Sequence, residues 1–572
     1  GNRTLYAYDA LGQVTRFSYG GPAGSATVTD PLGVVTRYEL DPDGRVTAIV
    51  VPSASLQPLR RITYTSAGDV ASVTDGEGRV TQFSYDSRGN LTLQRDAVGN
   101  TVTRVYDLRN QLVGETQAGA GASRTTCYVY DATTRNRVRF VVSPQGRVTE
   151  YRYSAFGERT ASIEYAGAAL AASATLTETS LVQWSAQQDR SATQRVDMAY
   201  DLRGELVTRT AYARVDVAGA GIADGSQAVE RYVRDASGRL LQVIAADGGV
   251  TSYAYDGLGR LVASADAAGR TATTVYDAAA RRSTVVESGS GLVTTRSYDA
   301  AGRLISLLQS APAMPAGETR YFYDGAGRLR MTQDATGVRR WLLYDDAGRQ
   351  VAEIDGNGTL TESRFDASGL LTWRATYATA VDTARLVDSS GRTTLGVALA
   401  SIRPAASQAD QREWFAYDAA GRLVRTARAM AAVTGGTSVA VTETRYDAAG
   451  RAVGLTGYAN LLVAGLGAGV AGVDALAAGT VSAPAASAQD RVSRNFYDAD
   501  GLLLGALDAQ GYLTSYSYDG TGQLTRSLAY ATATNAALRA AGTLAQLIPA
   551  TSAADARSFK VYDARGNLIG AI

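Results

Sequence analysis

Short segments of alternating character, each closed by a polar turn, follow one another along the chain. Aromatic residues stand two apart before the turn, as at Tyr253 and Tyr255 or at Tyr321 and Tyr323, and Thr and Val fill the remaining positions. A period of two places such rings on one face of a β-strand. The pattern predicts antiparallel strands, and the rings of neighbouring units are expected to stack into aromatic ladders.

The turns carry the motif Asp-x-x-Gly. Tyr-Asp pairs recur every 21 or 22 residues where the array is uninterrupted, as at Tyr255, Tyr276 and Tyr298, and a second Asp-x-x-Gly lies between successive pairs. Asp at the first position accepts hydrogen bonds from backbone groups ahead of it, and Gly at the fourth takes the left-handed conformation of a bulged hairpin turn. Each full repeat is therefore expected to contain two strands of roughly six or seven residues.

The residues singled out by this reasoning are structural, and no catalytic, cofactor-binding or metal-binding residue is assigned. They are the Tyr, Asp and Gly of six repeats: Tyr85, Asp86, Gly89, Tyr255, Asp256, Gly259, Tyr298, Asp299, Gly302, Tyr323, Asp324, Gly327, Tyr417, Asp418, Gly421, Tyr518, Asp519 and Gly522.

A fixed period of this size predicts one supersecondary unit stacked on its neighbours, in a chain more than half of which is antiparallel strand. About fifty strands at ~4.8 Å would make a sheet some 240 Å long, far beyond the size at which open sheets curl. Strand twist makes the curl helical, and a single layer that curls on itself leaves a lumen. We therefore expect an all-β spiral, a hollow shell or a tube.

Five Ala-rich insertions interrupt residues 1–572, which otherwise read as a single repeat array. Two exits match, Gln188-Asp189-Arg190 and Gln489-Asp490-Arg491, and residues 535–548 predict a short helix with Asn535 as its cap. Insertions of this kind are expected to project from one rim of the sheet. They cover about 166–195, 213–230, 378–412, 459–492 and 531–557.

One insertion contains a formal Gly-x-Gly-x-x-Gly, from Gly467 to Gly472. A dinucleotide site is disfavoured because the segment between Tyr458 and Tyr497 barely holds one βαβ unit. A membrane helix is disfavoured because Asp474 interrupts a weakly apolar run. A packed loop or small helix is expected instead, with no membrane span.

The composition of the chain argues against several classes of function. The 56 basic residues, nearly all Arg, balance 55 acidic ones, so no net basic patch favours nucleic acid. Arginines directly after the turn glycine, such as Arg260 and Arg328, are expected to pair with carboxylates of adjacent units. There is no His, and Cys127 is the only Cys, which leaves no His-based triad, no zinc cluster and no internal disulfide. We expect Cys127 to be a small core residue, the protein not to be an enzyme, and no cofactor.

The motif Tyr-Asp-x-x-Gly-Arg-Leu, at 255, 298, 323 and 417, together with the half-repeat from Asp75 to Asp86, resembles the YD-repeat of the Rhs family. That family is similar to the B and C subunits of insecticidal toxin complexes and to the YD shell of teneurins. The resemblance implies hairpins wound into a hollow shell, which in toxin members encloses a polymorphic C-terminal toxin. Family members often end with a self-cleaving Asp-Pro-x-Gly segment; here Asp30-Pro31 and Asp41-Pro42 lie near the start, inside ordinary repeats, and are expected to be turns.

Two functions follow from the resemblance. The first is a shell wall of an Rhs-type toxin or toxin-complex-like protein, which encapsulates a C-terminal cargo for delivery. The alternative is a cell-surface scaffold that binds a protein or a glycan through its insertions. Both imply a bacterial protein that is secreted or on the cell surface. Because both ends cut into repeats, we expect a piece of a longer polypeptide, with the cargo outside it. The sequence is compatible with a closed cocoon and with an open tube.

Overall fold

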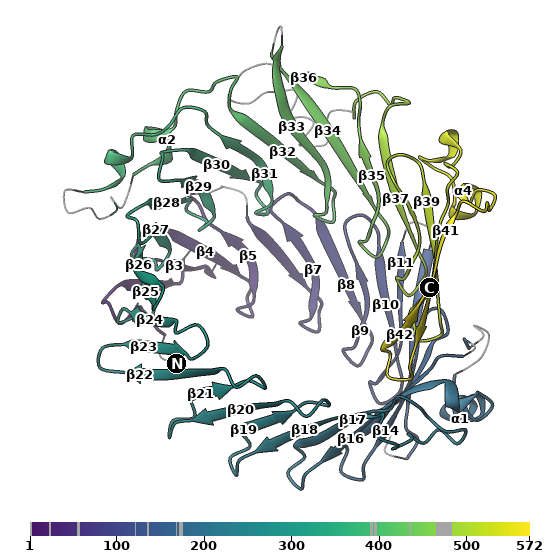
Figure 1. Cartoon of the computed structure of the whole chain (residues 1–572). Coiled ribbons are helices and arrows are strands. Elements are labelled where there is room, and N and C mark those ends of the chain that lie inside the picture. Colours follow the sequence, from purple (N-terminus) through teal and green to yellow (C-terminus); the bar gives the residue numbers. More distant parts are fainter. Residues whose placement is uncertain are drawn as a thin grey trace.

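The protein is one long antiparallel sheet that winds round an open centre (Figure 1). The computed structural model describes residues 3–21, 24–53, 58–119, 122–133, 136–167, 169–170, 176–388, 393, 397–433, 436–464 and 483–572. In these residues 42 strands form a single unclosed sheet, and each pairs with the next along the chain, except that β36 pairs with β34.

The first 23 strands run once round the centre. They are β1 (Tyr6–Tyr8), β2 (Val14–Tyr19), β3 (Ala26–Thr29), β4 (Val35–Leu40), β5 (Val46–Val50), β6 (Arg60–Tyr64), β7 (Val70–Asp75), β8 (Val80–Tyr85), β9 (Leu91–Arg95), β10 (Thr101–Tyr106), β11 (Leu112–Gly119), β12 (Ala122–Tyr130), β13 (Val138–Val142), β14 (Val148–Tyr153), β15 (Arg159–Tyr165), β16 (Thr193–Tyr200), β17 (Leu206–Ala211), β18 (Ala228–Arg234), β19 (Leu240–Ile244), β20 (Val250–Tyr255), β21 (Leu261–Ala265), β22 (Thr271–Asp277) and β23 (Arg282–Glu287).

The remaining strands begin a second pass over the first. They are β24 (Val293–Tyr298), β25 (Leu304–Ala311), β26 (Met314–Tyr323), β27 (Leu329–Gln333), β28 (Arg339–Tyr344), β29 (Gln350–Ile354), β30 (Leu360–Phe365), β31 (Leu371–Thr376), β32 (Gln411–Tyr417), β33 (Leu423–Val433), β34 (Gly436–Tyr446), β35 (Ala452–Gly457), β36 (Leu462–Ala464), β37 (Arg491–Tyr497), β38 (Leu503–Leu507), β39 (Leu513–Tyr518), β40 (Leu524–Ala529), β41 (Ala556–Tyr562) and β42 (Leu568–Ala571).

We call residues up to β23 the first coil and those from β24 the second coil. The all-β antiparallel class is confirmed. Two quantities were overestimated: the described strands number 42 rather than about fifty, and they hold slightly under half of the described residues. Turns and insertions take the rest, because each step of 10 or 11 residues leaves a strand of only five or six.

Helices occur only within the insertions of the described chain. They are α1 (Glu178–Ala186), α2 (Leu399–Ile402) and α4 (Leu544–Leu547), with 3-10 turns η2 (Arg190–Ala192), η3 (Thr383–Leu386) and η4 (Ala536–Leu538). The helix expected over residues 535–548 is split in two: Asn535 caps η4, Thr543 caps α4, and Gly542 lies between them. The Gly-x-Gly-x-x-Gly segment lies outside the described residues.

Hydrophobic cores form where insertions cover the sheet. Four clusters are found among the described residues, and each joins strands of one coil to the insertion that follows them. Under α1, for example, Phe140 and Ile163 pack with Leu181. The helices lie on the outer side of the ring in Figure 1, so these clusters lie on the outer face of the sheet. Because successive residues of a strand point to opposite faces, the intervening positions face the lumen.

A buried polar network accompanies the entry of several insertions. The hydroxyl of Tyr377 donates to Glu362 at 2.8 Å, and Arg403 donates two hydrogen bonds to the same carboxylate, at 2.7 and 2.9 Å. Tyr165 donates to Glu150 in the same way, at 2.6 Å. Burial and the hydrogen bond to Glu150 raise the pKa of Tyr165 to about 12.

In three insertions, one aspartate carboxylate joins the start of the insertion to its end, which we call the neck of the insertion. Asp410 accepts from the backbone N–H of Ala378 at the start of its insertion and from that of Ser407 near the end. Asp490 and Asp555 do the same for the next two insertions. The resemblance of exits noted in the sequence holds only in part, because Asp189 instead caps η2.

Candidate functional site: turn ladder and seam

The predicted motif residues lie at the ends of strands and in the turns that follow. Tyr85, Tyr255, Tyr298, Tyr323, Tyr417 and Tyr518 end β8, β20, β24, β26, β32 and β39. The next residue is the turn aspartate, at Asp86, Asp256, Asp299, Asp324, Asp418 and Asp519. The turn glycines all have positive φ: Gly89 (84°), Gly259 (79°), Gly302 (78°), Gly327 (81°), Gly421 (77°) and Gly522 (88°).

Each turn aspartate stabilises its own turn by accepting hydrogen bonds from backbone N–H groups. Oδ1 of Asp256 accepts from the backbone N–H groups of Leu258 and Arg260, both at 2.9 Å, and the N–H of Gly259 donates to the Asp256 carbonyl at 3.0 Å. The register of β20 against β21 shifts just before Tyr255, which is the bulge that the motif predicted. Similar contacts with Asn90 lower the pKa of Asp86 to about 2.

The structure adds a ladder of arginines that the sequence indicated only in part. Nε of Arg328 donates to Asp324 of its own turn at 2.9 Å, and its guanidinium lies over the ring of Tyr344 in the next repeat, 5.1 Å from the centroid. Its other end donates to the Asp345 carbonyl at 3.3 Å. Arg303 and Arg349 repeat the arrangement on either side. For these three arginines the expected pairing with carboxylates of adjacent units is therefore wrong: the carboxylate belongs to the same turn, and the adjacent unit supplies a ring and a carbonyl.

The repeat tyrosines do not stack on one another. In the described part of the chain, the ring pair in contact is Tyr165 with Trp184, not two repeat tyrosines. Repeat tyrosines are two strands apart, about 9.6 Å, which exceeds the ~4.5–7 Å of ring contacts. The arginine fills this interval, and the tyrosine hydroxyl binds backbone instead: Tyr255 donates to the Leu240 carbonyl at 3.0 Å. Tyr323, Tyr417 and Tyr518 donate in the same way to Leu304, Leu371 and Leu503.

That these motif residues have only a structural role stays a prediction. Replacing Gly259 or Gly421 by Val is expected to destabilise the local hairpin by about 1–2 kcal/mol or more, because a β-branched residue strongly disfavours φ near +80°. Hydrogen exchange of the flanking strands would measure the loss. Loss of a ligand-binding activity with unchanged local protection would contradict the prediction.

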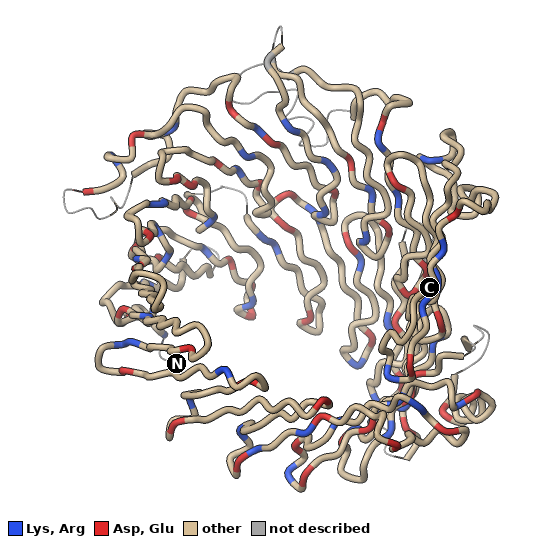
Figure 2. The backbone as a smooth tube through the Cα atoms, in the orientation of Figure 1, with Lys and Arg blue, Asp and Glu red and all other residues tan. Residues whose placement is uncertain are grey.

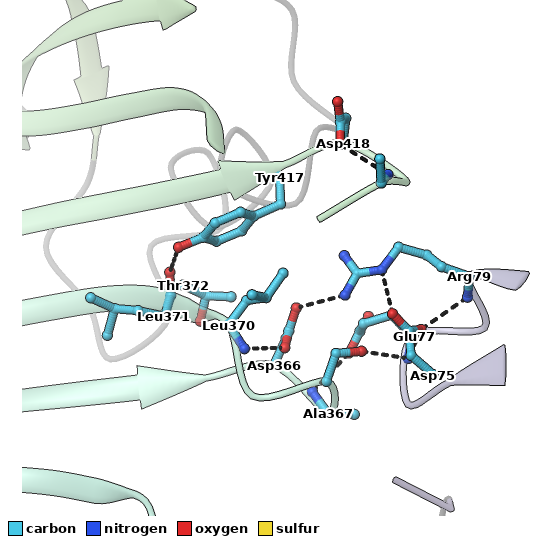
Figure 3. Close-up of polar contacts among 12 residues, drawn as sticks. Asp75, Glu77, Arg79, Asp366, Ala367, Leu370, Leu371, Thr372, Tyr417 and Asp418 are labelled. Carbon is cyan, nitrogen blue, oxygen red and sulfur yellow. Dashed lines mark hydrogen bonds and ion pairs between the residues drawn. The ribbon is translucent and has the colours of Figure 1, made fainter. Parts of the chain in front are cut away.

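The second function-bearing feature is the seam, where turns of the second coil lie on turns of the first. We call the turns after Tyr-Asp pairs and their equivalents, from Asp86 onward, the YD rim, and the half-repeat turns with the insertions the opposite rim. The YD rim of the second coil meets the opposite rim of the first. In Figure 3 the N–H of Ala367 donates to Glu77 at 2.9 Å, and Arg79 bridges Asp75, at 2.6 Å, and Asp366, at 3.7 Å.

The same kind of contact recurs along the seam. Asp500 accepts from the Ser143 hydroxyl at 2.8 Å and from the Gln145 N–H at 3.0 Å, and it pairs with Arg147. Further on, two N–H groups of the second coil donate to carbonyls of the first: Gly520 to Ala166, at 3.0 Å, and Ala564 to Ala213, at 3.1 Å. Turn follows turn at a constant interval: β30 lies 23 strands after β7, and β37 lies 23 ladder strands after β13, with β36 left out because it pairs only with β34.

Two glycines make close contacts in the seam: Gly520 in a YD turn of the second coil and Gly76 in the opposite rim of the first. A Cβ on Gly520, directly after the turn aspartate, would lie 2.4 Å from the Ala166 carbonyl oxygen, and one on Gly76 would lie 2.5 Å from the Ala367 oxygen. On the first coil, some positions of the YD rim have no neighbour that close. The matching position there is open at Gly257, and it holds the exposed side chains of Leu108 and Leu202.

Charged and potentially reactive groups form no further site in the described chain. Figure 2 shows both signs interspersed along the ribbon, with no large area of one sign. No group of acidic residues and Cys that could hold a metal ion is found among the described residues. Cys127 packs against the cluster under α1, and burial raises the pKa of its thiol. None of the described helices is long and apolar enough to cross a membrane.

Comparison with known proteins identifies the repeat. The RHS Repeat family model matches residues 26–55, 64–101, 234–271 and 497–534. No curated protein is significantly similar to the chain in sequence. Among solved structures, a TcdB2-TccC3-Cdc42 crystal structure is 15% identical over 99% of this chain and 31% of that chain, with a TM-score of 0.41. A TcdB2-TccC3-TEV structure is 13% identical over 92% and 30%, with a TM-score of 0.41, and a Tc holotoxin pore of Photorhabdus luminescens is 13% identical over 92% and 29%, with a TM-score of 0.37.

The chain thus spans about 30% of the length of those toxin-complex chains. The four matched segments lie in both coils, and each contains the Tyr-Asp-x-x-Gly or equivalent turns described above. The chain thus carries RHS repeats in both coils.

Proposed function

We propose that the chain is part of the wall of a hollow shell, in an Rhs-type toxin or a toxin-complex-like protein, and that the shell encloses a polypeptide cargo for delivery. The winding of the sheet carries this proposal. One coil takes 23 strands, which at ~4.8 Å each give a circumference of about 110 Å and a diameter of about 35 Å between backbones. Any tilt of the strands widens the ring.

The two faces of the wall support the assignment of inside and outside. On β14, Val148 and Glu150 are buried toward α1, and Thr149 and Tyr151 alternate with them toward the lumen. Charged residues on the lumen side neutralise one another, as in the ion pairs of Arg104 with Glu115 and of Arg340 with Glu353. A polar and nearly neutral lining holds a chain without adhering to it, which suits a cargo that must leave.

The alternative is a secreted or cell-surface scaffold that binds a protein or a glycan through its insertions. Three of the insertions are closed at the neck by Asp410, Asp490 and Asp555, and four contribute to the hydrophobic clusters. Their described parts are thus used to cover the sheet. This favours the shell over the scaffold.

Small-angle scattering tests the proposal. The chain in solution is expected to give a profile with a depleted centre or a tubular cross-section, because the lumen is filled with solvent. In the polypeptide that contains this chain, limited proteolysis should leave a cargo segment protected as long as the shell is intact. A profile of a solid globule, or turnover of a substrate lost on changing one residue, would contradict it.

A further inference from the structure

The contacts between the two coils are much weaker than the strand pairing within each coil. Within the ribbon, neighbouring strands share backbone ladders; β30 and β31 alone pair five residues of each. Apart from β23 and β24, where the ribbon passes from one coil into the next, no strand pairing joins the two coils among the described strands. The coils meet through turns, and the recorded contacts there are hydrogen bonds and ion pairs, several of them to side chains that water can replace.

The interior of the seam is incompletely filled. None of the four hydrophobic clusters includes residues of both coils. Two cavities, of about 470 and 840 Å³, are lined from both coils: the first by Arg147 and Asp500 among others, the second by Ala213 and Tyr562. Burial, and to a lesser extent the Glu77 carboxylate, raise the pKa of Asp366 at the contact in Figure 3.

We propose that the seam is a reversible opening in the wall: the second coil lifts from the first along the line from Asp366 to Ala564, while the strand ladder stays intact. Separation there breaks only turn-to-turn contacts and creates a lateral slot the length of the seam. An extended polypeptide can pass through such a slot without unfolding the wall. The use of the slot as a passage rests on the proposed shell function, but the opening itself does not.

A pair of matched glycine variants tests the opening. Gly520→Leu places a side chain against the Ala166 carbonyl of the other coil, whereas Gly257→Leu changes the equivalent turn position where nothing lies within 4 Å. Neither glycine has a positive φ, so the backbone tolerates both changes. In Gly520→Leu the amide of Ala564, which donates across the seam, is expected to exchange at least about tenfold faster, with strand amides of β39 and β40 unchanged. Gly257→Leu should exchange like the parent.

Two results would overturn the proposal. One is equal exchange of the Ala564 amide in both variants, which would mean that the seam accommodates the added side chain without opening. The other is parallel loss of protection in β39 and β40, which would mean that the coils unfold rather than separate.

A covalent closure gives an independent readout. In a Cys127→Ser background, Gly76→Cys with Ala367→Cys should form a disulfide when the coils move apart by about 1 Å, since a Cβ on Gly76 would lie 2.8 Å from that of Ala367. When reduced, this protein should show a larger radius of gyration in 1 M than in 0.05 M NaCl, because salt screens the seam charges. When oxidised, it should show a smaller increase or none. An unchanged radius in the reduced protein, or an equal increase in both forms, would contradict the opening.

Discussion

Replacing Phe140 by Ala is expected to destabilise the unit formed by β13 to β15 and α1 by about 3–5 kcal/mol, the usual cost of truncating a fully buried aromatic residue. Phe140 has no solvent-exposed surface and contacts the cluster under α1. The loss should be local, because each unit of a repeat array contacts mainly its neighbours. Hydrogen exchange of α1 and β15 is the appropriate measurement, since unfolding of so long an array is not two-state.

Phe156→Ala is the matched control. Phe156 lies in the turn after β14 and is 88% exposed, so its truncation should change local stability by less than about 0.5 kcal/mol. Equal effects of the two substitutions would mean that the insertion is not packed on the sheet as described, and the assignment of the outer face would then fail.

Replacing Glu362 by Ala is expected to cost about 2–4 kcal/mol in the unit around the insertion at 378–410. The carboxylate is buried and accepts from Tyr377 and Arg403, with Arg364 nearby. Burial alone would raise the pKa of Glu362, but these contacts outweigh it and hold the pKa below its usual range. Removing the acceptor leaves the Tyr377 hydroxyl buried without a partner. The arginines remain about 40% exposed, which keeps the cost below that of a fully buried charge pair.

Glu353→Ala on the adjacent strand provides the comparison. Glu353 pairs with Arg340 at an exposed position, where such pairs contribute about 0–1 kcal/mol. Exchange rates in η3 and α2 should rise in Glu362→Ala and stay unchanged in Glu353→Ala. A rise in both, or in neither, would show that the network does not anchor the insertion.

The turns could be predicted from the sequence because their determinants are local. Asp256 and Gly259 fix a turn within five residues, and the spacing repeats it. The ring ladder was mispredicted because alternation places Tyr255 and Tyr276 on one face but does not set the distance between them, and Arg260 occupies the interval, 4.3 Å from the Tyr276 centroid. Arg260 was recognised as a pairing residue, but its second partner belongs to the next repeat.

The seam was beyond prediction from the pattern. Glu77 meets Ala367, and Arg147 meets Asp500, across about three hundred residues or more, and which turns meet depends on the number of strands in one coil. Strand twist and the insertions set this number together, and neither can be read from the repeat. The residue directly after the turn aspartate does not mark the seam either: it is Gly or Ala at most second-coil turns but Asp346 at one, and in the first coil it is Ala236 and Gly257 as well as Leu108 and Leu202.

Because one coil takes 23 strands, the position of each turn in the second coil is fixed relative to the turns of the first. Hairpin tips on one rim recur every second strand, so tip meets tip between coils only when the count is odd; an even count would set each tip over a gap. Loss of one two-strand repeat between Gly78 and Asp366 would keep tips over tips but shift the phase. Glu77 would then face Ala419 and Ala420, which lack the hydroxyl that Ser368 offers its N–H. Alternatively the coil would contract by about 10 Å in circumference to restore the original partners. The number of repeats is thereby coupled to the width of the lumen, and this width can change only in steps of whole hairpins.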